Sequence, residues 1–146
     1  MRVLIQRVGW SRVEVEGREV SSTGPGMLVF LGVAGGDDED DAKYIAGKTA
    51  DLRIFEDSAG KMNLSVRDTG AQAMVVSQFT LVADTRKGNR PGFGSAAPPD
   101  RAERLYERFV QELKDLGISV KTGVFGADMA VSLLNDGPVT ILLESK

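Results

Sequence analysis

Two short segments of the chain have residue types that could act on a substrate. One is the run Ser77-Gln78-Phe79-Thr80, which follows the apolar residues 73–76. The other is the dipeptide Gly137-Pro138, which lies just before the apolar residues 141–143. The chain has no His and no Cys, so the commonest general base and the thiol nucleophile are both absent. Any reaction must therefore use backbone groups, hydroxyls, a few charges or the substrate itself.

The hydroxyls of Ser77 and Thr80 allow more than one interpretation. A hydroxyl nucleophile needs a base beside it, and no Lys or carboxylate lies within three residues of either one. Hydrogen bonding at the end of a strand is the simpler role for both. The backbone N–H groups of Phe79 and Thr80 could instead stabilise an oxyanion, and such a donor contributes about 3–4 kcal/mol. We therefore regard this segment as a positioning element rather than a source of a nucleophile.

Gly137-Pro138 is, on its own, typical of a turn between two strands. An X-Pro bond is also the one peptide bond that adopts the cis form at modest cost. Of the other candidates, Met129 is core filler by default, and Phe125 fits either a core position or a base-stacking one. The glycines at 123 and 126 match neither the P-loop nor the dinucleotide fingerprint, so a phosphate loop there is excluded.

Composition predicts one domain over residues 1–146, in a cytoplasmic protein that does not enter a membrane. Apolar residues make up 42% and charged residues 27%, no apolar run is long enough to span a bilayer, and the N-terminus does not resemble a signal peptide. The net charge of −3 argues against bulk attraction to nucleic acid, although Arg86, Lys87 and Arg90 form a local basic cluster. The acidic block 37–41 fits the first turn of a helix better than a metal site. We expect no metal and no cofactor.

The pattern of apolar residues predicts an α+β fold. The sheet is expected to be mainly antiparallel and curled or barrel-like, with two principal helices at 38–52 and 98–117. The expected strands are short: 2–8 and 10–16 joined through Gly9, a third piece after residue 17, a doubly buried strand at 26–33, short pieces near 53–55 and 60–63, and strands at 73–78, 118–122, 129–134 and 139–143. Residues 84–97 are predicted to form a loop.

Taken together, these segments resemble the D-aminoacyl-tRNA deacylase family along almost the whole chain. The resemblance rests on several motifs in order: Gln6-Arg7-Val8, residues 26–33, Lys48, residues 52–55, Gly60-Lys61-Met62-Asn63, residues 77–81, residues 87–91, residues 122–129, and residues 135–140. Gly9-Trp10 and Gly92 differ from the usual family pattern. The intact Ser77–Thr80 segment favours the D-selective type over a sister group with altered chiral selectivity.

The resemblance implies a homodimer that acts on aminoacyl-tRNA, with active sites at the subunit interface. Gly137-Pro138, with a cis bond, would reach from one subunit into the pocket of the other and reject L-aminoacyl groups, and Arg7 would hold that dipeptide. The catalytic segment would be Ser77, Gln78, Phe79 and Thr80, with Met129 and Phe125 at the substrate. The 2′-hydroxyl of the terminal adenosine would assist the attack on the ester.

Two interpretations compete with this one. A non-catalytic RNA-binding module would use the basic cluster Arg86, Lys87 and Arg90, and it would explain the missing acid–base pair. A purely structural dimer would need neither Gly137-Pro138 nor residues 77–80. The net negative charge and the lack of an aromatic RNA-binding motif weigh against the binding module.

Overall fold

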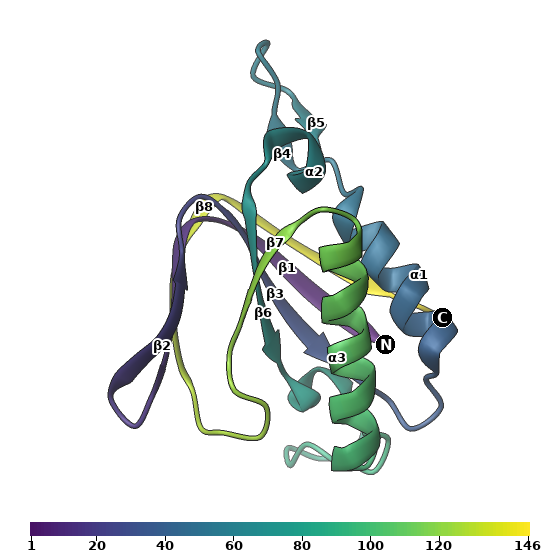
Figure 1. Cartoon of the computed structure of the whole chain (residues 1–146). Helices are drawn as coiled ribbons and strands as arrows, with labels where there is room; N and C mark the ends of the chain where they lie inside the picture. Colours follow the sequence, from purple (N-terminus) through teal and green to yellow (C-terminus); the bar gives the residue numbers. More distant parts are fainter.

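The computed structural model describes all of residues 1–146 and consists of one main sheet, one small hairpin and three α-helices (Figure 1). In chain order the elements are β1 (Arg2–Val15), β2 (Arg18–Thr23), β3 (Gly26–Gly32), α1 (Glu39–Ala50), β4 (Phe55–Glu56), β5 (Met62–Leu64), α2 (Val66–Thr69), β6 (Gln72–Ser77), a 3₁₀ turn (Phe79–Val82), α3 (Pro99–Asp115), β7 (Ser119–Thr122) and β8 (Ala130–Glu144).

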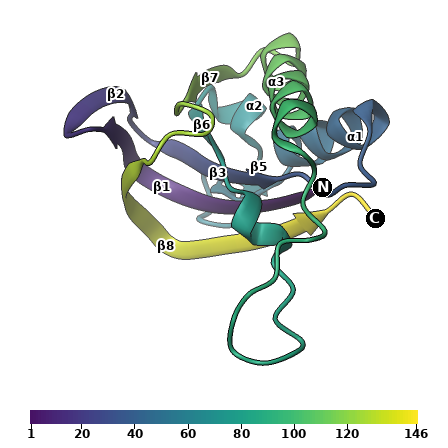
Figure 2. The ribbon, with the colours of Figure 1, turned by 90° about the horizontal axis from the view of Figure 1, so that it is seen from below.

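The main sheet has the strand order β2-β1-β3-β6-β7, and β8 pairs with the other side of β1. All three neighbours of β1 run antiparallel to it, whereas β3, β6 and β7 run parallel to one another. The sheet curls, with α1 and α3 side by side on one face and β8 towards the other (Figure 2). The predicted α+β class with a curled sheet and two principal helices is confirmed, with the short α2 added.

The first predicted strand pair is wrong, because residues 2–15 form one strand. Gly9 does not turn the chain: the first half of β1 pairs with β3 and the second half with β2. The C-terminal pair, 129–134 and 139–143, is likewise one strand, β8, so Gly137-Pro138 is not a turn between two strands. Both errors have one cause. A break in the alternation of apolar and polar residues predicts a turn, whereas a long strand can also change partners or bulge at such a point.

The core lies between the sheet and the two long helices. On α3, Leu105, Phe109 and Leu113 recur every four residues and are completely or almost completely buried, which is the pattern of an amphipathic helix. They pack in one cluster with Ile45 of α1 and with residues of the strands. Burying each such side chain stabilises the fold by about 1.5–3 kcal/mol. This layer holds the strand ends of the sheet in place.

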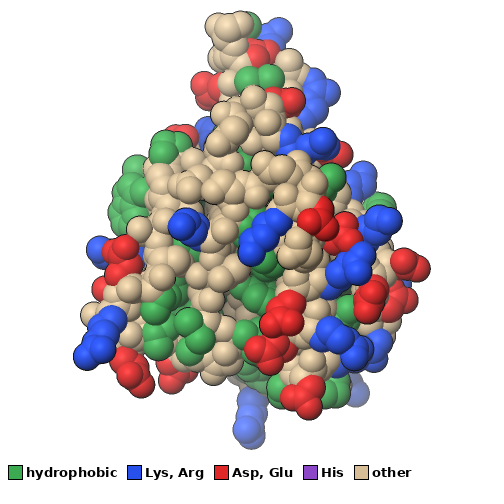
Figure 3. Space-filling model, viewed as in Figure 1, with side chains coloured by type: hydrophobic (Ala, Val, Ile, Leu, Met, Phe, Trp, Pro, Cys, Tyr) green, Lys and Arg blue, Asp and Glu red, His purple; other side chains and the backbone are tan.

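The acidic block 37–41 has structural partners in the folded chain. Asp38 caps α1, since its side chain accepts from the amide of Asp41 while the Asp41 carboxylate accepts from the amide of Asp38. Asp37 accepts from the Met1 amino group at 2.7 Å and from the amide of Ala34. On the surface, acidic and basic side chains are interspersed over the helical face and form no large patch of like charge (Figure 3). None of the helices has both the length and the apolar composition to cross a bilayer.

Candidate functional site

The parallel arrangement of β3, β6 and β7 brings their carboxyl ends to one edge of the sheet. A cavity of about 450 Å³ opens at this edge, which is within the range of small-molecule sites. The segments that follow the three strands and the first turn of α3 line it, and the lining is mainly apolar: Leu31, Val33, Val76, Ser77, Gln78, Phe79, Pro99, Ala102, Phe125, Gly126, Ala127, Asp128, Met129 and Val131.

Five of the residues predicted from the sequence meet in this cavity: Ser77, Gln78, Phe79, Phe125 and Met129. The first three continue from β6, and the other two follow β7, so they come together only because the strands are parallel. The other four predicted site residues, Arg7, Thr80, Gly137 and Pro138, are not among the residues that line it. Within a single chain, the predicted site residues therefore lie in two groups, one inside the cavity and one outside it.

The turn after β6 begins at the cavity, where Gln78 and Phe79 are lining residues. Ser77 pairs with Leu31 as the last residue of β6, and the amide of Gln78 donates to the Leu31 carbonyl at 2.8 Å. The 3₁₀ turn starts at the next residue, Phe79, so the N–H groups of Phe79 and Thr80 have no acceptor within the turn. The side-chain amide of Gln78 donates to the Thr80 hydroxyl, and both Phe79 and Thr80 are exposed.

Gly32 lets this turn pack directly on the backbone of β3. A Cβ atom at residue 32 would lie 2.9 Å from the Gln78 carbonyl oxygen and 3.0 Å from the Leu81 Cβ. Contacts this short force the neighbouring atoms to move. A glycine is therefore needed at the end of β3 for the turn to keep its place.

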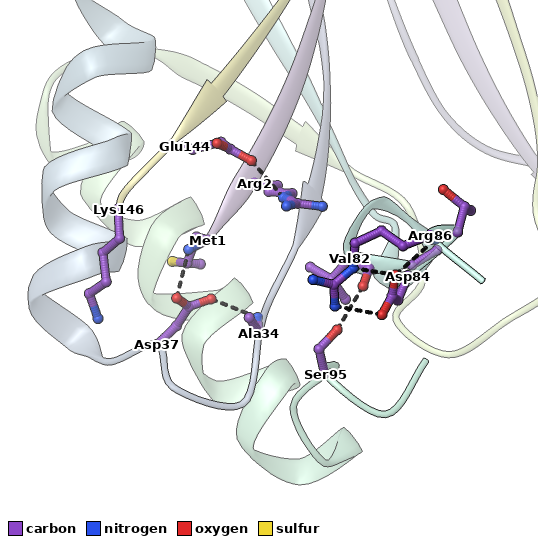
Figure 4. Close-up of a pocket in the computed structure, with 12 residues that line it drawn as sticks. Met1, Arg2, Ala34, Asp37, Val82, Asp84, Arg86, Ser95, Glu144 and Lys146 are labelled. Carbon is purple, nitrogen blue, oxygen red and sulfur yellow. Dashed lines mark hydrogen bonds and ion pairs between the residues drawn. The ribbon is translucent and has the colours of Figure 1, made fainter. Parts of the chain in front are cut away.

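A second cavity, of about 550 Å³, lies behind the turn (Figure 4). From this side Arg2 donates to the Leu81 carbonyl at 3.0 Å and is held by Glu144 at 2.7 Å. The Ser95 hydroxyl donates to the Val82 carbonyl at 2.8 Å. These contacts fix the last carbonyls of the turn. No motif in the sequence pointed to Arg2 or Ser95, because both act through backbone groups some 13 to 79 residues away.

Aromatic contacts hold two walls of the first cavity. Phe93 packs edge-on against Phe79 with ring centroids 5.0 Å apart, and Tyr106 lies 5.8 Å from Phe125. The Tyr106 hydroxyl donates to the Val75 carbonyl at 2.9 Å in a buried position. Burial raises the pKa of Tyr106 well above its ordinary value, so the hydroxyl stays protonated and acts only as a structural donor.

The chemistry available in the cavity is binding and polarisation rather than proton transfer by an acid–base pair. Asp128 is the one lining residue with a titratable side chain, and it is exposed. No group of three or more carboxylates is arranged to hold a metal ion. The mainly apolar lining suits an apolar group, and the amides of the adjoining turn that have no acceptor within it are donors that a carbonyl oxygen could use.

Gly137-Pro138 lies on a bulge of β8 and has a cis peptide bond. Gln6 pairs with Thr140 and Val8 with Asn135, so the four residues from Asp136 to Val139 stand opposite Arg7 alone. Gly137 has φ of +127°, where L side chains are strained, and a Cβ there would lie 3.0 Å from an Arg7 guanidinium nitrogen. Both residues of the dipeptide are exposed in the single chain.

Arg7 ties this bulge to the rest of the fold. Its side chain is almost fully buried, and its guanidinium donates to the Ile54 carbonyl at 2.8 Å and to the Asp136 carbonyl at 3.1 Å. The Asp136 carboxylate lies 3.5 Å from the same group. Arg7 thereby connects the bulge to the start of the β4–β5 hairpin.

Comparison with known proteins gives consistent matches. A profile of the family described as D-Tyr-tRNA(Tyr) deacylase matches residues 4–144. Proteins named D-aminoacyl-tRNA deacylase from Ruegeria pomeroyi and Cereibacter sphaeroides are 60% and 59% identical to this chain, over 99% of it and 99% and 100% of their own length.

Among solved structures, the c-Myc DNA Unwinding Element Binding Protein has a TM-score of 0.94 and 39% identity, with 100% of this chain and 99% of that one covered. A structure described as a probable eukaryotic D-amino acid tRNA deacylase has a TM-score of 0.86 at 17% identity, with 98% of both chains covered, which shows a shared fold.

The contacts of Arg7 predict a specific loss of stability. Arg7→Ala should lower the free energy of unfolding by about 2–3 kcal/mol, because it removes charge-assisted hydrogen bonds to two carbonyls. Amide exchange at Gly137 and Val139 should accelerate more than elsewhere. Urea titration and hydrogen exchange measure the two effects.

Arg12→Ala is the matched control for Arg7→Ala, since Arg12 lies on the same strand and makes only a half-exposed ion pair with Glu14. It should change stability by no more than about 0.5 kcal/mol. Equal destabilisation by the two variants, or unchanged exchange in the bulge, would show that Arg7 does not hold it.

Proposed function

The chain belongs to the D-Tyr-tRNA(Tyr) deacylase family, and on this premise we propose that it hydrolyses the ester bond of D-aminoacyl-tRNA, releasing the free D-amino acid and tRNA. The observation that carries the proposal is the end-to-end similarity to relatives named D-aminoacyl-tRNA deacylase. An apolar cavity with backbone donors at its edge and no acid–base pair suits such a substrate. The activity would belong in the cytoplasm, where charged tRNA is made.

In the proposed complex the aminoacyl ester lies against the turn after β6. The amides of Phe79 and Thr80 would donate to the ester oxygen as negative charge develops on it, which is typically worth a factor of about 10²–10³ in kcat. Ser77 and Gln78 would shape the turn, with Gln78 orienting the Thr80 hydroxyl. Phe125 and Met129 would pack against the terminal adenosine from the opposite wall.

Proton transfer would come from the substrate. The 2′-hydroxyl of the terminal adenosine would assist the attack of water on the ester carbonyl. The tetrahedral intermediate would then collapse with cleavage of the bond to the 3′-oxygen, which takes up the proton. This assignment fits a chain without His or Cys whose cavity has a single exposed carboxylate. The protein would contribute orientation and charge stabilisation.

Chiral selection would need a second copy of the chain. Gly137 and Pro138 are exposed and lie outside their own chain's cavity, so we propose that they enter the cavity of the partner in a homodimer. One edge of β8 is unpaired, and the strand also exposes Leu134 and Leu142, each by 54%. Apolar side chains on an open strand edge favour burial against another chain. A monomer in sedimentation equilibrium that retained full selectivity would overturn the shared site.

Rejection of L-aminoacyl groups would be steric. The backbone of Gly137-Pro138, held by Arg7, would occupy the position of an L side chain, whereas a D side chain would point elsewhere. A restrained backbone would distinguish D- from L-aminoacyl groups well, because it has no alternative rotamer that would make room for an L side chain. Glycine has no side chain to collide, so the same geometry would admit a glycyl group.

The direct test is an ester-hydrolysis assay with matched substrates. The protein should release D-tyrosine from D-tyrosyl-tRNA and leave L-tyrosyl-tRNA intact, and it should cleave glycyl-tRNA at high enzyme concentration. Acid gel electrophoresis of the charged tRNA follows ester loss. Retained tRNA binding without release of D-tyrosine would support the non-catalytic RNA-binding module instead, and neither binding nor release would support the structural dimer.

Gly137→Ala tests the selection mechanism. The added Cβ meets Arg7 and the backbone of Val139 at a positive φ, so the bulge must shift. The ratio of D-tyrosyl to L-tyrosyl hydrolysis should fall by at least tenfold, with the dimer intact by sedimentation. Gly36→Ala is a suitable control, because a Cβ at Gly36 meets nothing within 4 Å. An unchanged ratio in Gly137→Ala with a demonstrably displaced bulge contradicts steric selection.

Thr80→Ala tests the source of the proton transfer. Because the Thr80 amide remains, kcat should fall only about tenfold or less, whereas a substrate ending in 2′-deoxyadenosine should be almost inert. Single-turnover rates on both substrates measure this difference. A folded Thr80→Ala variant that binds tRNA but has no detectable activity would mean that the hydroxyl itself reacts.

A further inference from the structure

The segment after the 3₁₀ turn forms a closed loop that stands out from the body of the protein (Figure 2). Asp84 and Gly92 pair as an antiparallel bridge, with reciprocal amide-to-carbonyl bonds of 2.7 and 2.9 Å. The residues between them, 85–91, are all exposed. We call residues 85–91 the basic loop, since they contain Arg86, Lys87 and Arg90 and no acid.

Two positive charges of the basic loop have no partner in the protein. Asp84, at its base, accepts from the Arg86 guanidinium at 2.9 and 2.7 Å, and this pairing lowers the pKa of Asp84 well below its ordinary value. Arg86 and Asp84 therefore cancel each other. Lys87 and Arg90 take part in no ion pair or side-chain hydrogen bond, so a chain of net charge −3 presents a local charge of +2 at the loop tip.

The base of the basic loop is joined to the wall of the site cavity. Phe93, just after the closing bridge, packs on Phe79, and Ser95 holds the Val82 carbonyl. Each leg of the loop has three or four residues and so extends at most about 10–14 Å. Lys87 and Arg90 thus lie no more than about 14 Å from the base of the loop, where Phe93 contacts Phe79 of the cavity wall.

We propose that Lys87 and Arg90 bind phosphates of the single-stranded 3′ end of the tRNA, next to the nucleotide that carries the ester. This inference rests on the proposed function and adds to it the surface that contacts the RNA backbone. Unpaired cations on a loop whose base packs on the cavity wall fit a polyanion that runs past the cavity. The helical face offers no comparable surface, because its charges are mixed (Figure 3).

The test compares a substrate with phosphates to one without them. In the double variant Lys87→Ala/Arg90→Ala, KM for D-tyrosyl-tRNA should rise at least tenfold while kcat stays within about twofold. Hydrolysis of 3′-O-(D-tyrosyl)adenosine, which has no phosphate, should be unchanged. The slope of log(kcat/KM) against log[salt] should become shallower by about 1.4, since each phosphate contact to a single strand contributes about 0.7.

A matched control removes the same charges elsewhere. Arg18 and Lys43 are exposed, lie on β2 and α1 and form no ion pair, so Arg18→Ala/Lys43→Ala should leave both KM and the salt slope close to wild type. Equal effects of the two double variants would reject the loop as the contact and assign the change to net charge. Equal losses on the tRNA and adenosine esters would also reject it.

Failure of the proposed function gives a different result. If the wild-type protein hydrolyses neither ester, equilibrium binding of tRNA still decides the role of the loop. The affinity of the Lys87→Ala/Arg90→Ala variant and its salt slope should then fall relative to the Arg18→Ala/Lys43→Ala control. No difference between the two variants in binding would overturn the proposal.

Discussion

The fold depends on β1 being shared by three neighbouring strands. Its first half lies between β3 and β8, and its second half between β2 and β8. Because the alternation of a strand is fixed, this sharing decides which side chains face the helices and which face away. It also determines what stands opposite the one irregular point of β8. The residue at that point is Arg7, whose buried guanidinium donates to the Asp136 carbonyl in the bulge and to the Ile54 carbonyl just before β4. The Gly137-Pro138 bulge is thus a consequence of how β1 is paired.

The two groups of proposed site residues depend on different strand pairing, one antiparallel and the other parallel. The antiparallel β1–β8 pair can absorb extra residues as a bulge, and it holds Gly137-Pro138 outward. The parallel strands β3, β6 and β7 instead end together, and the segments after them close a cavity. Neither arrangement alone brings Gly137-Pro138 to the cavity. In the proposed homodimer, a second copy of the chain would do so without further elements.

Much of this could be predicted from the sequence, and the limits are physical. The helices could be placed because apolar residues recur on one face of α3 and because Asp38 begins α1 as a cap. The meeting of Ser77, Phe79, Phe125 and Met129 was expected only through the family resemblance, since nothing local says that β6 and β7 are parallel neighbours. Gly9 and Gly137-Pro138, taken on their own, predict turns that the structure does not have, because a bulge and a turn use the same residues. No sequence pattern indicates the roles of Arg2 and Ser95, since each contacts the turn only through a backbone carbonyl that is distant in sequence.

A chain without His or Cys can be a selective hydrolase because rigidity replaces reactive side chains. Oxyanion stabilisation needs amides fixed before the substrate arrives, and here the turn is fixed from several sides. Gly32 lets it rest on β3, Arg2 and Ser95 hold its last carbonyls, and Phe93 packs on Phe79. The proposed steric selection likewise needs a rigid backbone, and the hydrogen bonds of Arg7 would restrain it. The same stiffness makes the outer contacts matter. The loop of Lys87 and Arg90 contacts the turn through Phe93, so a phosphate bound there would be held at a fixed distance from the amides that would face the ester in the proposed complex.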